Sequence, residues 1–90
     1  MNVQRRKRIT AVIGELGAIS EKMERILNEI EEIKNEEEEY LDNIPENLQG
    51  SERYTNTEET VDNLNTAYDM WQETFDSLDD ITTALEEAMA

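Results

Sequence analysis

The sequence contains no cysteine and no histidine, and it has only one proline and three glycines. Without cysteine there is no disulfide framework and no thiolate nucleophile. Without histidine as well, the serines lack a base, and a metal site with nitrogen or sulfur ligands has no support. The three glycines do not form a phosphate-binding loop. These absences predict a protein that is not an enzyme and has no cofactor and no metal.

Positive charge is also scarce, because no lysine or arginine follows Arg53 although ten carboxylates do. Of the net charge of -15, residues 1–8 carry +4, residues 9–53 carry -9 and residues 54–90 carry -10. A body of this sign repels nucleic acids and anionic membranes and attracts basic surfaces. We therefore expect a basic protein partner, with no direct contact to nucleic acid or membrane.

Long hydrophobic runs are missing too. The stretch from Ile9 to Ile19 is interrupted by Glu15 and two glycines, so it is neither a signal-peptide core nor a membrane span. The sequence predicts a cytoplasmic protein.

Apolar residues are instead spaced by alternating steps of three and four, which are the a and d positions of a heptad. Between residues 9 and 43 a helix is predicted, with Glu37 as the only charged member of its apolar row. Additional apolar residues at position e (Ile13, Leu27 and Leu41) widen the stripe, which implies more than one partner helix. The row comprises Ile9, Val12, Leu16, Ile19, Met23, Ile26, Ile30, Ile33, Tyr40 and Ile44.

Pro45 ends this helix near Asn43, because proline lacks an amide donor and disfavours helical angles in the residue before it. A turn at about 44–51 follows, and Ser51 is the predicted N-cap of a second helix at about 52–88, with Thr55 as a later alternative. Two helices of similar length predict an all-α antiparallel helical hairpin, coiled-coil-like, as a single domain at 9–90. Its second apolar row is Tyr54, Thr57, Val61, Leu64, Tyr68, Trp71, Phe75, Leu78, Thr82, Leu85 and Met89.

In this hairpin, residues of the two rows whose numbers add to 94 are expected to be neighbours. Met23 then lies beside Trp71, and a polar layer of Glu37 and Thr57 lies next to the turn. A lone polar layer disfavours slipped registers, although a local relaxation near the turn is the alternative interpretation. The remaining pairs are Leu16 with Leu78, Ile19 with Phe75, Ile26 with Tyr68, Ile30 with Leu64 and Ile33 with Val61.

A second face of small or uncharged residues predicts a homodimer. Gly14 and Gly17 each cost a helix interior about 1 kcal/mol relative to alanine, and close approach of another backbone would compensate. The simplest assembly that covers such faces is a four-helix bundle of two hairpins. The predicted dimer face comprises Ala11, Gly14, Ala18, Ala67, Met70, Thr74, Ile81 and Ala84.

The remaining positions of the second helix form an acidic stripe, namely Glu59, Asp62, Asp69, Glu73, Asp76, Asp80 and Glu87. Acids three or four residues apart lie about 5 to 6 Å from one another, which is on the scale of phosphates along a nucleic-acid strand. The stripe could therefore imitate a phosphate backbone. The plainer interpretation is a solubilising solvent face.

The basic residues at 1–8 form a predicted N-terminal arm, comprising Arg5, Arg6, Lys7 and Arg8. In the hairpin this arm lies beside the end of the second helix, where Glu86, Glu87 and the negative pole of the helix dipole favour cations. We expect this pairing in preference to a contact with DNA, which the acidic body would repel.

The segment Tyr40–Tyr54, YLDNIPENLQGSERY, with Glu58, Glu59, Asp62 and Leu64 after it, resembles small acidic helical proteins of bacteria and their phages. The resemblance implies a mobile-element setting, in which small acidic proteins often inhibit host proteins that bind nucleic acids. No functional residue carries over from it.

The leading hypothesis is a non-enzymatic, protein-binding inhibitor that presents its acidic stripe to a basic nucleic-acid-binding protein, such as a nuclease or a defence complex. The alternative is a structural or assembly coiled-coil adaptor with apolar contacts and a merely solubilising acidic face.

Overall fold

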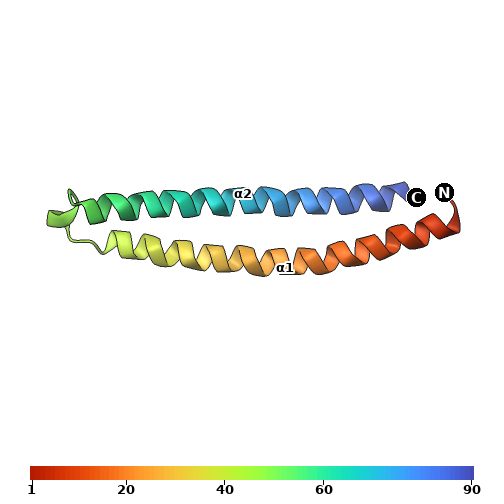
Figure 1. The fold of residues 1–90 in the computed structure, drawn as a ribbon, viewed down its shortest axis with the longest axis horizontal. Coiled ribbons are helices and arrows are strands. Elements are labelled where there is room, and N and C mark those ends of the chain that lie inside the picture. Colours follow the sequence, from red (N-terminus) through yellow and green to blue (C-terminus); the bar gives the residue numbers. More distant parts are fainter.

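The computed structural model describes residues 1–90 as two long helices, α1 (Val3–Asp42) and α2 (Glu52–Ala88), joined by a turn that contains the short 3-10 helix η1 (Glu46–Leu48). The helices run side by side in opposite directions, with both chain termini at one end (Figure 1). The molecule measures 69 × 15 × 14 Å. The predicted all-α hairpin is confirmed. Neither helix has the length and apolarity needed to cross a membrane.

Helix α1 begins earlier than the sequence predicted. The side chain of Asn2 accepts a hydrogen bond from the Arg5 amide at 2.8 Å and caps the helix. The four basic residues therefore form the first turns of α1, so the expectation of a separate arm at 1–8 and a helix start near residue 9 was wrong.

The turn follows the prediction closely. Helix α1 ends at Asp42, three residues before Pro45, and Ile44 folds inward with only 5% of its surface exposed. The Ser51 hydroxyl accepts a hydrogen bond from the Tyr54 amide at 3.2 Å and donates one to the Leu48 carbonyl at 2.6 Å. Ser51 is thus the N-cap of α2, and the later start at Thr55 is excluded.

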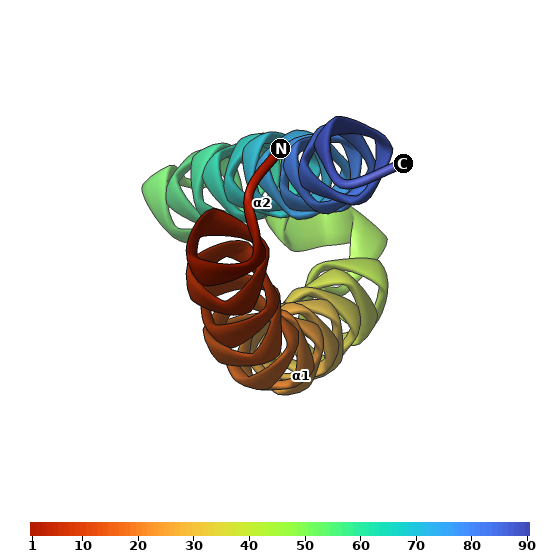
Figure 2. The same cartoon turned by 90° about the vertical axis from the view of Figure 1, so that its right-hand side faces the viewer.

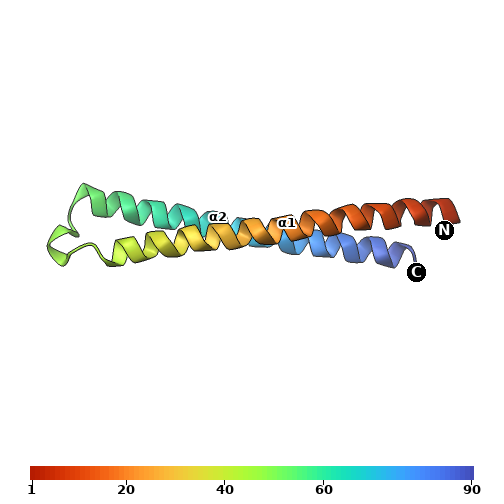
Figure 3. The same ribbon diagram turned by 90° about the horizontal axis from the view of Figure 1, so that it is seen from below.

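Helix α2 turns its predicted apolar row toward α1, since every member of that row is buried or half-buried. The indole Nε1 of Trp71 donates a hydrogen bond to the Met23 carbonyl at 2.9 Å, which confirms the predicted register at this layer. The two helices cross and wind around each other along their length, as the end-on and lower views show (Figures 2 and 3).

Helix α1 is rotated relative to the sequence prediction. Its inward side is formed by the row from Ile9 through Leu16, Met23 and Ile30, together with Ile13, Ser20, Leu27, Lys34 and Leu41. The other predicted seam row is exposed, so the expected enclosure of Ile19, Ile26 and Ile33 against α2 was wrong. Two facing helices cover only two rows each, whereas α1 offers three apolar rows, and one must remain outside.

The predicted polar layer lies inside the hairpin. Thr57 is 8% exposed, and its hydroxyl donates to the Arg53 carbonyl at 2.8 Å. Glu37 is half-buried, and its Oε2 is inaccessible to solvent and has no hydrogen-bond partner. This layer therefore carries a cost for the hairpin, because a buried polar atom without a partner is destabilising.

The core of the single hairpin is thin. Only five of 90 residues are buried, and none is completely enclosed. The accessible surface is 6723 Å², about 1,300 Å² more than the roughly 5,400 Å² expected for a compact chain of 10.5 kDa.

Candidate functional site

An exposed apolar row runs along α1. Its five members recur every seven residues and retain about two fifths to one half of their surface: Val12 43%, Ile19 50%, Ile26 37%, Ile33 42% and Tyr40 41%. We call this row, together with the neighbouring row of α2, the apolar face. The α2 row comprises Arg53, Thr60, Ala67, Thr74 and Ile81.

A contact near the turn shows which residues of α2 lie beside this row. The Arg53 guanidinium donates from Nε to the Tyr40 hydroxyl and stacks over its ring, 5.1 Å from the centroid. Because the helices are antiparallel and both repeat every seven residues, each heptad step from Tyr40 and Arg53 gives the next layer. The layers are Tyr40 with Arg53, Ile33 with Thr60, Ile26 with Ala67, Ile19 with Thr74 and Val12 with Ile81.

The α2 side of the apolar face carries no charge beyond Arg53. Ile81 is 52% exposed, and Met70, one turn from Ala67 and Thr74, is 63% exposed. The hydroxyls of Thr60 and Thr74 each donate to the carbonyl four residues earlier, at 3.0 Å. Since those hydroxyls are already paired within the helix, a partner could cover both threonines without stranding a polar group.

The predicted dimer face is divided between two sides of the molecule. Ala67, Thr74 and Ile81 belong to the apolar face, and Met70 and Ala84 border it. In contrast, Ala11, Gly14 and Ala18 lie about 100 to 160° around the α1 axis from the Val12 row. A Cβ added at Gly14 or Gly17 would meet no atom within 4 Å. On α1 the apolar face is instead formed by the Val12 row, which the heptad pattern predicts in the hairpin core.

The enclosed rows of α1 are less apolar than the exposed one. Ser20 and Lys34 both occupy inward positions. The Lys34 ammonium lies 5.0 Å from the Tyr68 ring centroid and 4.0 Å from the Glu38 carboxylate, so its charge is compensated while its stem packs in the seam. The row left outside contains only Val, Ile and Tyr.

The acidic stripe lies on α2, about 100° or more around its axis from the Ala67 row, and all seven of its side chains are exposed. Its only side-chain hydrogen bond joins the Asp76 carboxylate to the Gln72 amide at 3.2 Å. The only ion pair of the molecule is between Lys34 and Glu38. The carboxylates of the stripe therefore have no positively charged partner within the molecule.

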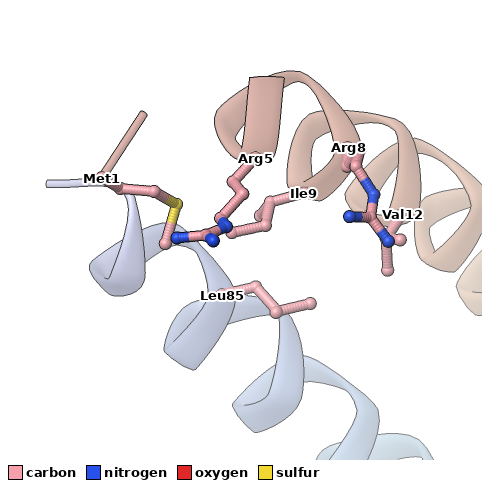
Figure 4. Close-up of a pocket in the computed structure, with 6 residues that line it drawn as sticks. All are labelled: Met1, Arg5, Arg8, Ile9, Val12 and Leu85. Atoms are coloured by element: carbon pink, nitrogen blue, oxygen red, sulfur yellow. The ribbon is translucent and has the colours of Figure 1, made fainter. Parts of the chain in front are cut away.

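The basic residues do not pair as predicted. No cation at the start of α1 lies within 4.0 Å of Glu86 or Glu87. Two of these cations, Arg5 and Arg8, border a groove at the open end of the hairpin. The groove has a volume of about 280 Å³. Its apolar part is formed by Met1, Ile9, Val12 and Leu85 (Figure 4).

No three carboxylates converge on a point where they could hold a metal ion. Comparison with known proteins returns no match, neither a protein family nor a curated protein nor a solved structure. The candidate functional sites are therefore two surfaces, the apolar face and the acidic stripe.

Proposed function

We propose that this protein is a non-enzymatic assembly module in which two hairpins associate through their apolar faces to form a four-helix bundle. The observation that carries the proposal is the distribution of polar and apolar side chains on α1. A polar serine and a lysine occupy the enclosed side, while five apolar residues lie exposed at heptad spacing. A second interface over that row would remove its five apolar side chains from water, which is favourable.

The exposed area supports the same conclusion. A standard protein interface covers about 800 Å² of each partner, and the hairpin exposes about 1,300 Å² more than a compact chain of its mass. Contiguous exposed apolar patches of several hundred Å² are typical of interaction sites.

The decisive experiment changes the apolar face without changing the hairpin seam. A variant with Ile19→Gln, Ile26→Gln and Ile33→Gln is expected to be a helical monomer in analytical ultracentrifugation, whereas the unaltered chain is a dimer. The control is Ala11→Gln with Ala18→Gln, which adds the same side chain on the outer side of α1 and should leave the dimer intact. A monomeric unaltered chain, or dissociation only in the control, would overturn the proposal.

A second function is favoured by the unpaired acidic stripe. We propose that the bundle presents it to a basic, nucleic-acid-binding protein and competes with phosphates, as an inhibitor of a nuclease or defence complex would. The supporting observation is that seven exposed carboxylates extend over about 42 Å of α2 without one cation within 4.0 Å. If the stripe serves only solubility, the assembly function still stands, and the inhibitor function does not.

The test is capture of a partner from host lysate, with duplex DNA and increasing salt as competitors. Binding is expected to be lost with DNA, with salt and in the variant carrying Asp69→Asn, Glu73→Gln, Asp76→Asn and Asp80→Asn. The matched control, with Glu21→Gln, Glu24→Gln, Glu29→Gln and Glu32→Gln, removes the same charge from α1 and should still bind. Equal binding by both variants would exclude phosphate mimicry by the stripe.

A further inference from the structure

We infer that the occupant of the apolar face is a second copy of this chain docked antiparallel, with the turn of each hairpin over the open end of the other. The inference rests on the proposed assembly function, because it specifies the partner and the orientation at that same face. Two arrangements of a symmetric four-helix bundle are possible: the two turns lie at the same end, or at opposite ends. Charge and shape both select opposite ends.

Charge is distributed unequally along the hairpin. The turn end, residues 31–59, contains eleven carboxylates and two cations, a net charge of -9. The open end, residues 1–15 and 79–90, contains five carboxylates and four cations, a net charge of -1. Docking with the turns together would place two strongly negative ends against each other, whereas antiparallel docking places each beside the only cationic cluster.

The open end also offers a matching shape. The groove there continues the apolar face, because Val12 is both the first layer of that face and part of the groove lining. Arg5 lies one heptad before Val12, just beyond the end of this row. In Figure 4 the Arg5 side chain extends from α1 toward Met1, the Arg8 side chain lies beside Val12, and Leu85 lies across from them on α2. The groove thus combines an apolar floor with a cationic border.

The turn of a second copy has the complementary properties. The five layers of the apolar face are symmetric about Ile26, so a two-fold axis through that layer pairs Ile19 with Ile33 and Val12 with Tyr40 of the second copy. The groove beyond Val12 then faces the turn, where Leu48 is 42% exposed. We expect Leu48 to enter the groove, with Glu39 and Glu46 near the two arginines.

Cross-linking distinguishes the arrangements, since the chain has no cysteine of its own. A variant with Val12→Cys and Tyr40→Cys is treated with a short thiol cross-linker and mapped by mass spectrometry. Linkage of position 12 to position 40 between chains is expected. A dimer linked only through like positions, or not linked, overturns the orientation while leaving the proposed assembly function standing. A monomer in ultracentrifugation overturns both.

Charge reversal provides an independent test on folded chains. Arg5→Glu with Arg8→Glu in one variant, and Glu39→Lys with Glu46→Lys in another, are each expected to weaken dimerisation about tenfold or more, and mixing the two should restore it. Because the altered side chains are exposed, helicity serves as the check of folding. If mixing gives no recovery, the turn of one copy does not contact the open end of the other.

Discussion

The indole Nε1 of Trp71 and the main-chain carbonyl of Met23 are joined by a hydrogen bond of 2.9 Å, although the residues are 48 positions apart. The other two hydrogen bonds that connect the two sides of the hairpin lie at its ends, so this one alone joins the helices near the middle. Because it joins a side chain to a backbone atom in one specific layer, it opposes sliding of the helices past each other.

Trp71→Phe keeps an aromatic ring in the seam and removes this donor. Loss of a typical hydrogen bond lowers the free energy of unfolding by about 1 kcal/mol, and the smaller ring adds to the loss. The measurement is urea unfolding followed by circular dichroism. Slow exchange of the indole proton in NMR should accompany the bond in the unaltered chain, and an unchanged urea midpoint in the variant would contradict its role.

Glu37→Leu is expected to stabilise the hairpin by about 1 kcal/mol or more, because it replaces a carboxylate whose buried Oε2 lacks a partner. Any acid-to-leucine change also reduces the repulsion of a chain with net charge -15, so Glu31→Leu at an exposed position of the same helix is the control. The increase in thermal midpoint should be larger for Glu37→Leu. Equal increases would mean that the buried oxygen carries no specific cost.

Gly14→Ala and Gly17→Ala should each stabilise α1 by about 1 kcal/mol, the difference in helix propensity between the two residues. The structure provides the space, since nothing lies within 4 Å of either added Cβ. Thermal unfolding measures the gain, and ultracentrifugation gives the oligomeric state of the same samples. Dissociation of a dimer by these changes would place the glycines in the interface, as the sequence analysis expected.

Salt should stabilise this protein. The acidic stripe repels itself without a compensating cation within 4.0 Å, and raising ionic strength from about 0.01 M to 1 M shortens the screening length from about 30 to 3 Å. The thermal midpoint is therefore expected to rise with sodium chloride. The variant with amides at Asp69, Glu73, Asp76 and Asp80 should respond less, and an equal slope would show that the stripe is not the source.

Much of this architecture follows from local sequence. The single proline and the Ser51 cap define the turn, and the heptad rhythm defines two helices and the inward row of α2. The exposure of the acidic stripe follows equally, because unpaired carboxylates avoid burial. The start of α1 was missed, because a single asparagine cap at Asn2 extended the helix over residues that composition alone marked as an arm.

Only the tertiary structure decided how α1 is rotated about its own axis. The sequence offers apolar rows on both sides of the Met23 row, one containing Val12 and one containing Ile13, and periodicity cannot choose between them. The choice depends on what α2 presents in each layer: the indole of Trp71 bonding the Met23 carbonyl, and the ring of Tyr68 accommodating Lys34. That rotation leaves the Val12 row outside. The apolar face is thus a consequence of packing between the helices, whereas the helices themselves are a consequence of the sequence.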